Sequence, residues 1–438
     1  MSDLQKSMGG TVGTFVALST ILGSGMMILP GTSYHELGRS VWIPWTIAAL
    51  SVVPLLYCYA WLGRRHPSAS GVAHYAEIAL GPSAGRAAGM SATFALVTGI
   101  PGTAVTGGRY AAQFSGVGSL TWIFPVLVLA GATAVARVGT NVSGRLQVTL
   151  ILCLFAVVLL TAAAAVAVHG PKAPATALPP IGRIGGVLTA VYVAFTGWET
   201  VAFTFEEHKQ PHLIPRIFAA SYLIVVTLYA LVLAGLFAAV SSHDDALDSA
   251  PLLLLAQRAF GGLGRPVTLL LVLAPITANV FASVLALSRL VFGLARSGYL
   301  PAPLSRVRAR DRNPVTAVLA VGAVLTLIAV TASTGLVPFE SLFIVSGGIY
   351  FVLYGIGAAS FARLAEPRAA TRAVTVLCAV TVTAVTLLAG PPMWLCWFLF
   401  AAVFAAAALH RRSRTRDPAA AGPPPAPRPA ADHQRSPR

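Results

Sequence analysis

The sequence consists largely of apolar runs of about 20 residues, the length that an α-helix needs to cross a bilayer. This repetition restricts what the chain can fold into. Hydrophobic residues make up 56% of the 438 positions and charged residues 10%, and the mean hydropathy is +0.77. Soluble domains carry roughly 25% charged residues, so the composition excludes a soluble globular protein. We therefore predict an all-α polytopic membrane protein.

The apolar runs and their boundaries predict twelve membrane-spanning helices. Their ranges are 11–35, 41–63, 86–115, 119–136, 146–168, 184–206, 216–241, 266–295, 314–333, 338–362, 372–389 and 392–410. A short amphipathic helix is expected between spans two and three. Cytoplasmic loops of membrane proteins are enriched in Lys and Arg. With the N-terminus inside, 16 of these residues fall in inner segments before the tail and 5 in outer ones, which predicts cytoplasmic termini in a cell-membrane protein.

The net charge of +16 does not indicate nucleic-acid binding, because the basic residues lie mostly in short loops between spans. The tail at 411–438 is rich in Arg, Pro and Ala, and we predict that it is disordered. It either contacts anionic lipid headgroups or is a solvated segment that fixes topology. The histidines are scattered, so we expect no metal site, no cofactor and no enzyme chemistry.

Span one contains an anomaly, Gly23-Ser24-Gly25 followed by Pro30. Glycine in a helix interior costs about 1 kcal/mol relative to alanine, and freed backbone groups are costly in lipid unless protein or water satisfies them. The stretch is therefore either a close-packing notch or an unwound point. A second anomaly five spans later favours unwinding, since Gly197 lies in mid-span with Glu199 two positions on. Paired broken helices in two inverted halves point to a transporter site at the bilayer midplane.

The two breaks predict what the site binds. Unwinding at 23–25 exposes amide groups at the start of a half-helix, whose positive dipole end suits a carboxylate. Unwinding at Thr196 and Gly197 exposes carbonyl groups that suit an ammonium. An α-amino acid carries both groups. The side chains near the breaks are largely apolar, including Met26, Ile100 and Phe195, which favours a neutral apolar substrate.

Several stretches together resemble the amino acid–polyamine–organocation superfamily of permeases. They are the Gly23-Ser24-Gly25…Pro30 break and residues 66–72, 195–199, 207–216 and 288–301. Within this superfamily, the sequence of residues 67–74 most resembles that of the bacterial exporters of methionine and branched-chain amino acids. One departure concerns Val193, which stands where several relatives have an aromatic gate.

The resemblance implies a core of ten helices in two inverted repeats, a leucine-transporter-type fold, with two peripheral helices. The domains are then a cytoplasmic N-terminus at 1–10, repeats at 11–168 and 184–362, a hairpin at 372–410 and the tail. Carried over by position, the carboxylate site falls on Gly23, Ser24 and Gly25, and the amine site on Phe195, Thr196 and Gly197. Glu199 matches a glutamate linked to proton coupling in some relatives, although a permanently paired structural carboxylate is an equal interpretation.

Other polar residues in the spans have less defined roles. Asn279 and Ser283 lie one turn apart on span eight, where they face the cavity, replace a sodium ligand or join helices. Asn279 is also a candidate for a gate or ion path. Arg109 either takes part in an ion path or extends toward the outer face. Tyr192 and Trp198 are candidate gate residues. Arg289 and Arg296 are expected to bind carbonyl groups, lipid, or Glu206 and Glu207.

The predicted function is secondary active transport of neutral apolar amino acids (methionine, leucine, isoleucine or valine) by alternating access. Proton-coupled efflux is the favoured mode, with protons as the coupling ion and a monomer or homodimer as the assembly. Two alternatives remain at this stage. One is an uptake permease or exchanger with the same fold, and the other is a non-transporting membrane protein that senses amino acids.

Overall fold

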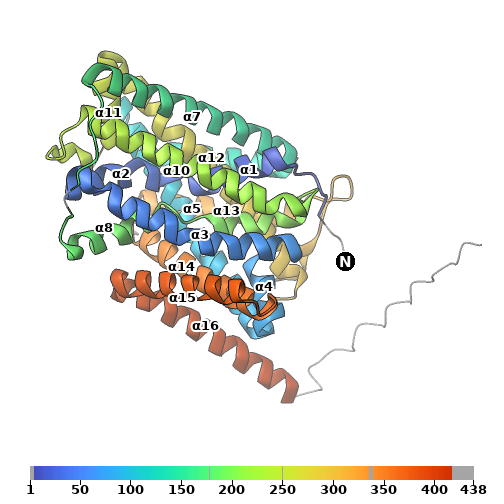
Figure 1. Cartoon of the computed structure of the whole chain (residues 1–438). Helices are drawn as coiled ribbons and strands as arrows, with labels where there is room; N and C mark the ends of the chain where they lie inside the picture. The colour runs from blue at the N-terminus through green and yellow to red at the C-terminus, as the bar shows by residue number, and fades with distance from the viewer. Residues whose placement is uncertain (1–3, 177, 249, 335–338, 417–438) are drawn as a thin grey trace, which may run out of the picture.

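The computed structural model describes residues 4–176, 178–248, 250–334 and 339–416. Within these ranges the chain is helical, with one isolated β-bridge between Met8 and His208. Figure 1 shows the long helices running side by side as a bundle, with α15 (Ala369–Ala389) and α16 (Pro391–Arg416) along one side of it. Residues 1–3 lie outside the described residues, and so do residues 417–438, which make up most of the predicted tail.

The predicted all-helical class is confirmed. The remaining α-helices are α1 Gly10–Ile21, α2 Ser24–Leu37, α3 Trp42–Arg65, α4 Val72–Leu80, α5 Pro82–Ser115, α6 Leu120–Val138, α7 Thr140–His169, α8 Ile181–Val193, α9 Trp198–Val201, α10 Ile214–Ala239, α11 Pro251–Phe260, α12 Gly264–Arg296, α13 Val315–Ser333 and α14 Phe339–Leu364. In the described ranges, 11 segments are long and apolar enough to span a membrane. The number is 12 when α1 and α2, bent by 51°, count as one span, which agrees with the predicted twelve.

Helix boundaries depart from the predicted ranges where proline and glycine set them. The third span begins at Pro82 rather than at 86, because proline lacks the N–H that a first helical residue does not need. The fifth begins at Thr140 rather than at 146, directly after Gly139, whose φ of 136° ends α6. The expected amphipathic helix is α4. The short helix α11 was not predicted.

The centre of the bundle is closely packed through small residues. Helix α5 packs against α4, α6, α12 and α14. A Cβ atom added at Gly99 of α5 would lie 2.5 Å from the Ser346 hydroxyl oxygen of α14. A Cβ atom at Gly293 of α12 would lie 2.8 Å from the Ser70 amide nitrogen. Such contacts are how helices associate closely in a bilayer, where water does not drive apolar association.

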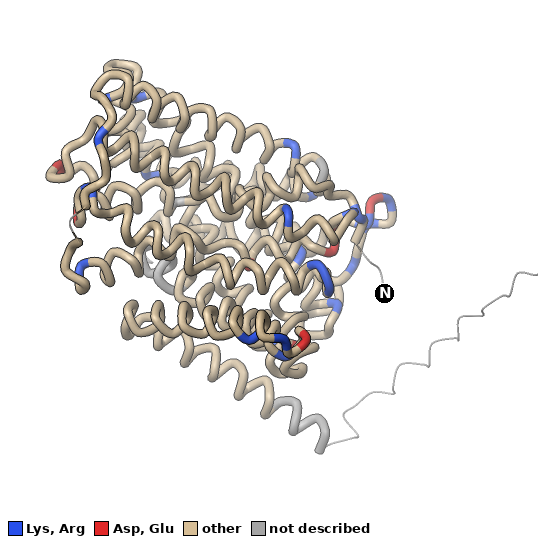
Figure 2. The backbone as a smooth tube through the Cα atoms, viewed as in Figure 1, with Lys and Arg blue, Asp and Glu red and all other residues tan. Residues whose placement is uncertain are grey.

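Charged residues gather at the two ends of the bundle and leave its middle largely free of them (Figure 2). We call the end that carries Met8, α4 and the α12–α13 loop the terminal end. There the N-terminal segment pairs with the end of the 3-10 helix η2 (Ala202–Glu207). The amides of Ser7 and Met8 donate to the Glu207 carbonyl oxygen at 3.0 and 2.9 Å. This pairing fastens the segment before α1 to the far end of the sixth span.

Candidate functional site

The first span is broken at the predicted glycines. Helix α1 ends at Ile21 and α2 begins at Ser24, so the backbone of Leu22 and Gly23 joins two half-helices. The amide of Gly23 donates to the Ile21 carbonyl oxygen at 3.0 Å, and the amide of Met26 to the Gly23 carbonyl oxygen at 3.2 Å. The first amides of α2 have no preceding turn to bond, so they form the positive end of a helix inside the bundle.

The sixth span is broken between Val193, where α8 ends, and Trp198, where α9 begins. Gly197 has a φ of 112°, which side chains with a Cβ atom rarely adopt. An added Cβ atom there would lie 2.6 Å from the Thr20 carbonyl oxygen. On the other side, a Cβ atom at Gly25 would lie 3.6 Å from Cα of Ala194. The two breaks, far apart in the sequence, therefore contact each other through their backbones.

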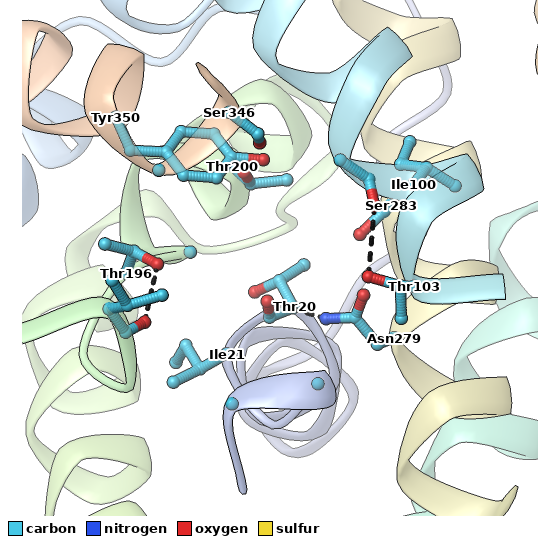
Figure 3. A pocket seen from close by; sticks show the side chains of 16 residues that line it. Thr20, Ile21, Ile100, Thr103, Thr196, Thr200, Asn279, Ser283, Ser346 and Tyr350 are labelled. Carbon is cyan, nitrogen blue, oxygen red and sulfur yellow. Dashed lines mark hydrogen bonds between the residues drawn. The ribbon is translucent and has the colours of Figure 1, made fainter. Parts of the chain in front are cut away.

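A cavity of about 80 Å³ lies where the breaks meet, which is room for several water molecules. Figure 3 shows its labelled side chains converging from several helices, with Tyr350, Ser346 and Thr200 together on one side and Asn279, Thr103 and Ser283 on the other. The lining residues are Thr20, Ile21, Gly23, Gly25, Gly99, Ile100, Thr103, Val193, Thr196, Gly197, Thr200, Asn279, Ser283, Ser346, Gly347 and Tyr350. None of these carries a charged side chain, so the wall is uncharged but polar.

Side-chain donors satisfy much of the exposed backbone around the cavity. The Asn279 side-chain amide donates to the carbonyl oxygens of Ser19 and Thr20 at 3.0 and 2.9 Å. The Thr196 hydroxyl donates to the Val193 carbonyl oxygen at 2.8 Å, and the Thr103 hydroxyl to that of Gly99 at 3.1 Å. Side chains thus bond the last carbonyl groups of α1 and α8, which stabilises both broken spans in their unwound form.

Glu199 lies behind the cavity wall and is fully buried. Both of its carboxyl oxygens lie 3.2 Å from the amide nitrogen of Gly197. The Thr200 hydroxyl donates to Oε1 at 3.3 Å. The hydroxyl of Tyr354 contacts the same carboxyl group and also the Phe195 carbonyl oxygen at 3.3 Å. The partners of Glu199 are therefore neutral groups that donate hydrogen bonds.

Seven of the predicted site residues line the cavity. Those in the lining are Gly23, Gly25, Ile100, Thr196, Gly197, Asn279 and Ser283. Met26 is buried in the core, and the side chain of Ser24 lies outside the described part of the structure. Phe195 lines a separate apolar cavity with Trp45 and Tyr229.

Of the residues predicted for a gate or ion path, Asn279 lines this cavity, whereas Tyr192, Trp198 and Arg109 do not. Tyr192 contacts the Ser51 hydroxyl through its own hydroxyl at 2.5 Å. Trp198 is buried with its ring 5.4 Å from that of Phe218. Arg109 has an exposed side chain. Each of these three residues therefore lies away from the space between the two breaks.

Sequence reasoning did not assign several lining residues to the site, including Thr20, Thr103, Thr200 and Tyr350. One signal could have found Tyr350. Ser346 and Tyr350 stand four residues apart, so they share one face of α14. Thr200 follows Glu199 directly, but nothing local indicates which of these two neighbours faces the cavity.

A charged cluster lies at the terminal end, and two of its pairs agree with one of the predicted alternatives. The Arg289 Nε atom bonds Glu207 Oε1 at 2.6 Å, with both side chains buried. Thr140 donates to Glu207 as well. Arg296 bonds both carboxyl oxygens of Glu206, at 2.7 and 2.5 Å. These pairs connect α12 to the end of η2, on the side of the second break that faces the terminal end.

Comparison with known proteins identifies the relatives of this chain. A family model described as amino acid permease matches residues 13–418. YecA, an uncharacterized amino acid permease of Bacillus subtilis, is 26% identical over 336 residues, which are 75% of this chain and 78% of YecA. The L-methionine/branched-chain amino acid exporter YjeH of Escherichia coli is 26% identical over 377 residues, 81% of this chain and 85% of YjeH. Other relatives are named cationic amino acid transporter 4, in Arabidopsis thaliana and Mus musculus.

Among solved structures, that of MhsT in complex with L-phenylalanine matches with a TM-score of 0.62 at 13% identity. The match covers 88% of this chain and 98% of MhsT. At this identity the likeness shows the fold, which is of the predicted leucine-transporter type.

Proposed function

Because the chain belongs to the amino acid permease family, whose members are transporters rather than enzymes, we propose that it exports neutral apolar amino acids in exchange for protons. The observation that carries this proposal is the uncharged cavity formed where two broken helices touch. Broken helices at the midplane let one site open alternately to each side of the membrane.

The two breaks supply complementary ends for a zwitterion. The amides at the start of α2, at Ser24 and Gly25, suit the carboxylate because a helix N-terminus favours negative charge. The hydroxyl groups of Thr196 and Thr200 line the opposite wall and can accept from an ammonium. Glu199, behind Thr200, adds negative charge to that side when it is ionised. This polarity fixes the orientation of an α-amino acid in the cavity.

The remaining wall favours an apolar side chain. Ile21, Ile100 and Val193 provide aliphatic surface, and burying a charged side chain against them without a partner is costly. The relatives' names point to both branched-chain and cationic substrates, so the names do not decide between them. The uncharged lining is what favours neutral amino acids here.

Two features support protons rather than sodium as the coupling ion. The carbonyl oxygens at the end of α1 that converge on one point are bonded there by the Asn279 amide, a neutral donor in the place where a cation would need oxygen ligands. Glu199 is a buried titratable group one residue from the cavity wall. Proton binding at Glu199 would change the charge next to the ligand without a metal ion.

The proposed orientation of the protein in the membrane rests on the basic residues. Their bias, 16 against 5, supports cytoplasmic termini, and the terminal end would then face the cytoplasm. The two repeats at 11–168 and 184–362 are the units that we propose to move against each other during transport.

Counterflow in proteoliposomes tests this proposal. Vesicles loaded with unlabelled leucine should accumulate labelled leucine and methionine, and accumulation should respond to an imposed pH gradient. Replacement of sodium by choline should change nothing. Transport of arginine or glutamate with none of leucine or methionine would exclude the proposed substrate class. A sodium requirement without a pH response would exclude the proposed coupling.

A further inference from the structure

Glu199 is linked to the cavity through two hydroxyl groups. Thr200 donates to Glu199 and also lines the cavity. Tyr350 lines the cavity too, with its hydroxyl facing those of Thr200 and Ser346. Figure 3 shows Tyr350, Thr200 and Ser346 side by side on one wall. A row of hydroxyl groups, which we call the Glu199–Thr200–Tyr350 chain, thus runs from the carboxyl group to the ligand space, and its first step is a hydrogen bond.

The direction of this chain depends on whether Glu199 is ionised. An ionised carboxylate can only accept hydrogen bonds, and each hydroxyl has one proton to donate. Thr200 therefore gives its proton to Glu199, and Tyr350 can give its proton to Thr200. Ser346 donates to the Ala95 carbonyl oxygen at 2.9 Å, so toward Tyr350 it acts as an acceptor. In this state the wall presents oxygen lone pairs to the cavity.

A protonated Glu199 becomes a donor and needs an acceptor. The Gly197 amide cannot accept, whereas the hydroxyl oxygen of Thr200 can. Once Thr200 accepts from Glu199, its own proton turns toward Tyr350, and the Tyr350 proton turns toward Ser346 or the cavity. Tyr354 is the competing acceptor, since it can donate to the Phe195 carbonyl oxygen instead. Tyr354 does not line the cavity.

We propose that Thr200 is the positioning residue through which Glu199 acts on the ligand. Proton binding reverses the Glu199–Thr200–Tyr350 chain and turns a hydroxyl proton toward the ammonium group of a bound amino acid. This inference rests on the proposed function. The reversed chain offers a donor where the ammonium needs an acceptor, and the negative charge behind it is gone. Proton and amino acid then exclude each other, which is the condition for exchanging one for the other.

The other ionisable groups around α9 do not replace this chain. Tyr354 of α14 and Tyr59 of α3 face the carboxyl group from the side away from the cavity, and Tyr59 donates to the Leu353 carbonyl oxygen at 2.8 Å. On η2 and α12, Glu206 and Glu207 are bonded to Arg296 and Arg289. Helix α1 contributes the hydroxyls and carbonyls of Ser19 and Thr20, which do not titrate in this range.

The test measures binding of labelled leucine to the purified full-length protein between about pH 8 and about pH 4, a range that includes the ordinary pKa values of glutamate and histidine, about 4.3 and 6.5. Wild-type affinity should fall several-fold on acidification. Thr200→Val keeps the side-chain shape and removes the hydroxyl, so its affinity should lose most of the wild-type pH response and keep only the part that comes from the charge of Glu199. Thr200→Ser restores a hydroxyl and should restore the pH response. Tyr350→Phe breaks the chain at its other end and should also flatten the response.

Two control variants make the outcome decisive. Thr103→Val removes a cavity hydroxyl that bonds its own helix, and Tyr354→Phe removes the other hydroxyl partner of Glu199. Both should keep the wild-type pH response, whatever they do to affinity. The inference is overturned if Thr200→Val and Tyr350→Phe keep the response while Glu199→Gln or Tyr354→Phe loses it. A wild-type protein that binds leucine without any pH response would instead overturn the proposed proton coupling.

Discussion

The cavity and the terminal end use polar residues in opposite ways. The cavity is lined by hydroxyls, one amide, glycines and aliphatic side chains, and none of its lining residues is charged. At the terminal end, two arginines bond two glutamates, with Glu207 also bonded by Thr140. A site that must bind and release its ligand is better served by weak neutral contacts. A closed end is better served by fixed charge pairs, which are costly to separate.

The two regions are also connected. The second broken span runs from the cavity at Gly197 through Glu199 to Glu206 and Glu207 at the terminal end. The N-terminal segment before α1 is bonded to the same end, with Leu4 donating to Glu206 Oε1 at 3.2 Å. A change in the break therefore reaches the charge pairs through α9 and η2, which together are ten residues long.

The largest effect should come from the contact between the breaks. Gly197→Ala adds a Cβ atom 2.6 Å from the Thr20 carbonyl oxygen at a φ of 112°, and left-handed backbone alone costs about 1–2 kcal/mol for such a residue. We expect leucine counterflow to be abolished. Gly186→Ala, on the preceding helix with nothing within 4 Å of an added Cβ atom, is the matched control. Wild-type counterflow in Gly197→Ala would show that the breaks need not touch.

The next largest effect should come from the buried charge pair. Arg289→Met leaves Glu207 buried without its cation, and such a loss typically costs about 3–5 kcal/mol. Thermal unfolding in detergent should show a large drop in midpoint for this variant, with Arg289→Met/Glu207→Gln recovering part of it. Arg296→Met should cost less, because its pair is partly exposed, at 18% and 13%, and two backbone amides also bond Glu206. A larger drop in the unfolding midpoint for Arg296→Met than for Arg289→Met would contradict this ranking of the two charge pairs.

The smallest effect concerns pH and the N-terminal segment. His208 pairs with Met8 outside the spans, and burial lowers the pKa of its imidazole to about 4. The unfolded chain takes up this proton near its ordinary pKa of ~6.5, so the free energy of unfolding falls as pH drops from there toward about 4. The loss is on the order of 3 kcal/mol.

Thermal unfolding between these pH values should show less acid sensitivity in His208→Leu than in the wild type. The exposed His243 provides a control substitution, His243→Leu, that should leave the acid sensitivity unchanged. Equal acid sensitivity in wild type and His208→Leu would mean that other groups set the pH dependence of the terminal end.

The sequence by itself determined the features that depend on local composition. Apolar runs of spanning length gave the class and the number of spans, because a helix in lipid must satisfy its own backbone. Gly23, Gly25 and Gly197 marked the breaks, because a glycine in a span is a local anomaly. Glu199 was visible as a carboxylate at membrane depth for the same reason. Five stretches in order indicated the family.

Only the tertiary structure decided which side chains meet the cavity. Successive side chains on a helix point about 100° apart. An unwound segment changes the direction in which the following side chains point, by an amount that no local sequence pattern encodes. Gly25 therefore lines the cavity while its neighbour Met26 enters the core. Thr200 faces the ligand space while Glu199 lies behind it. Tyr350 joins them from a helix about 150 residues away, a contact set by packing between helices.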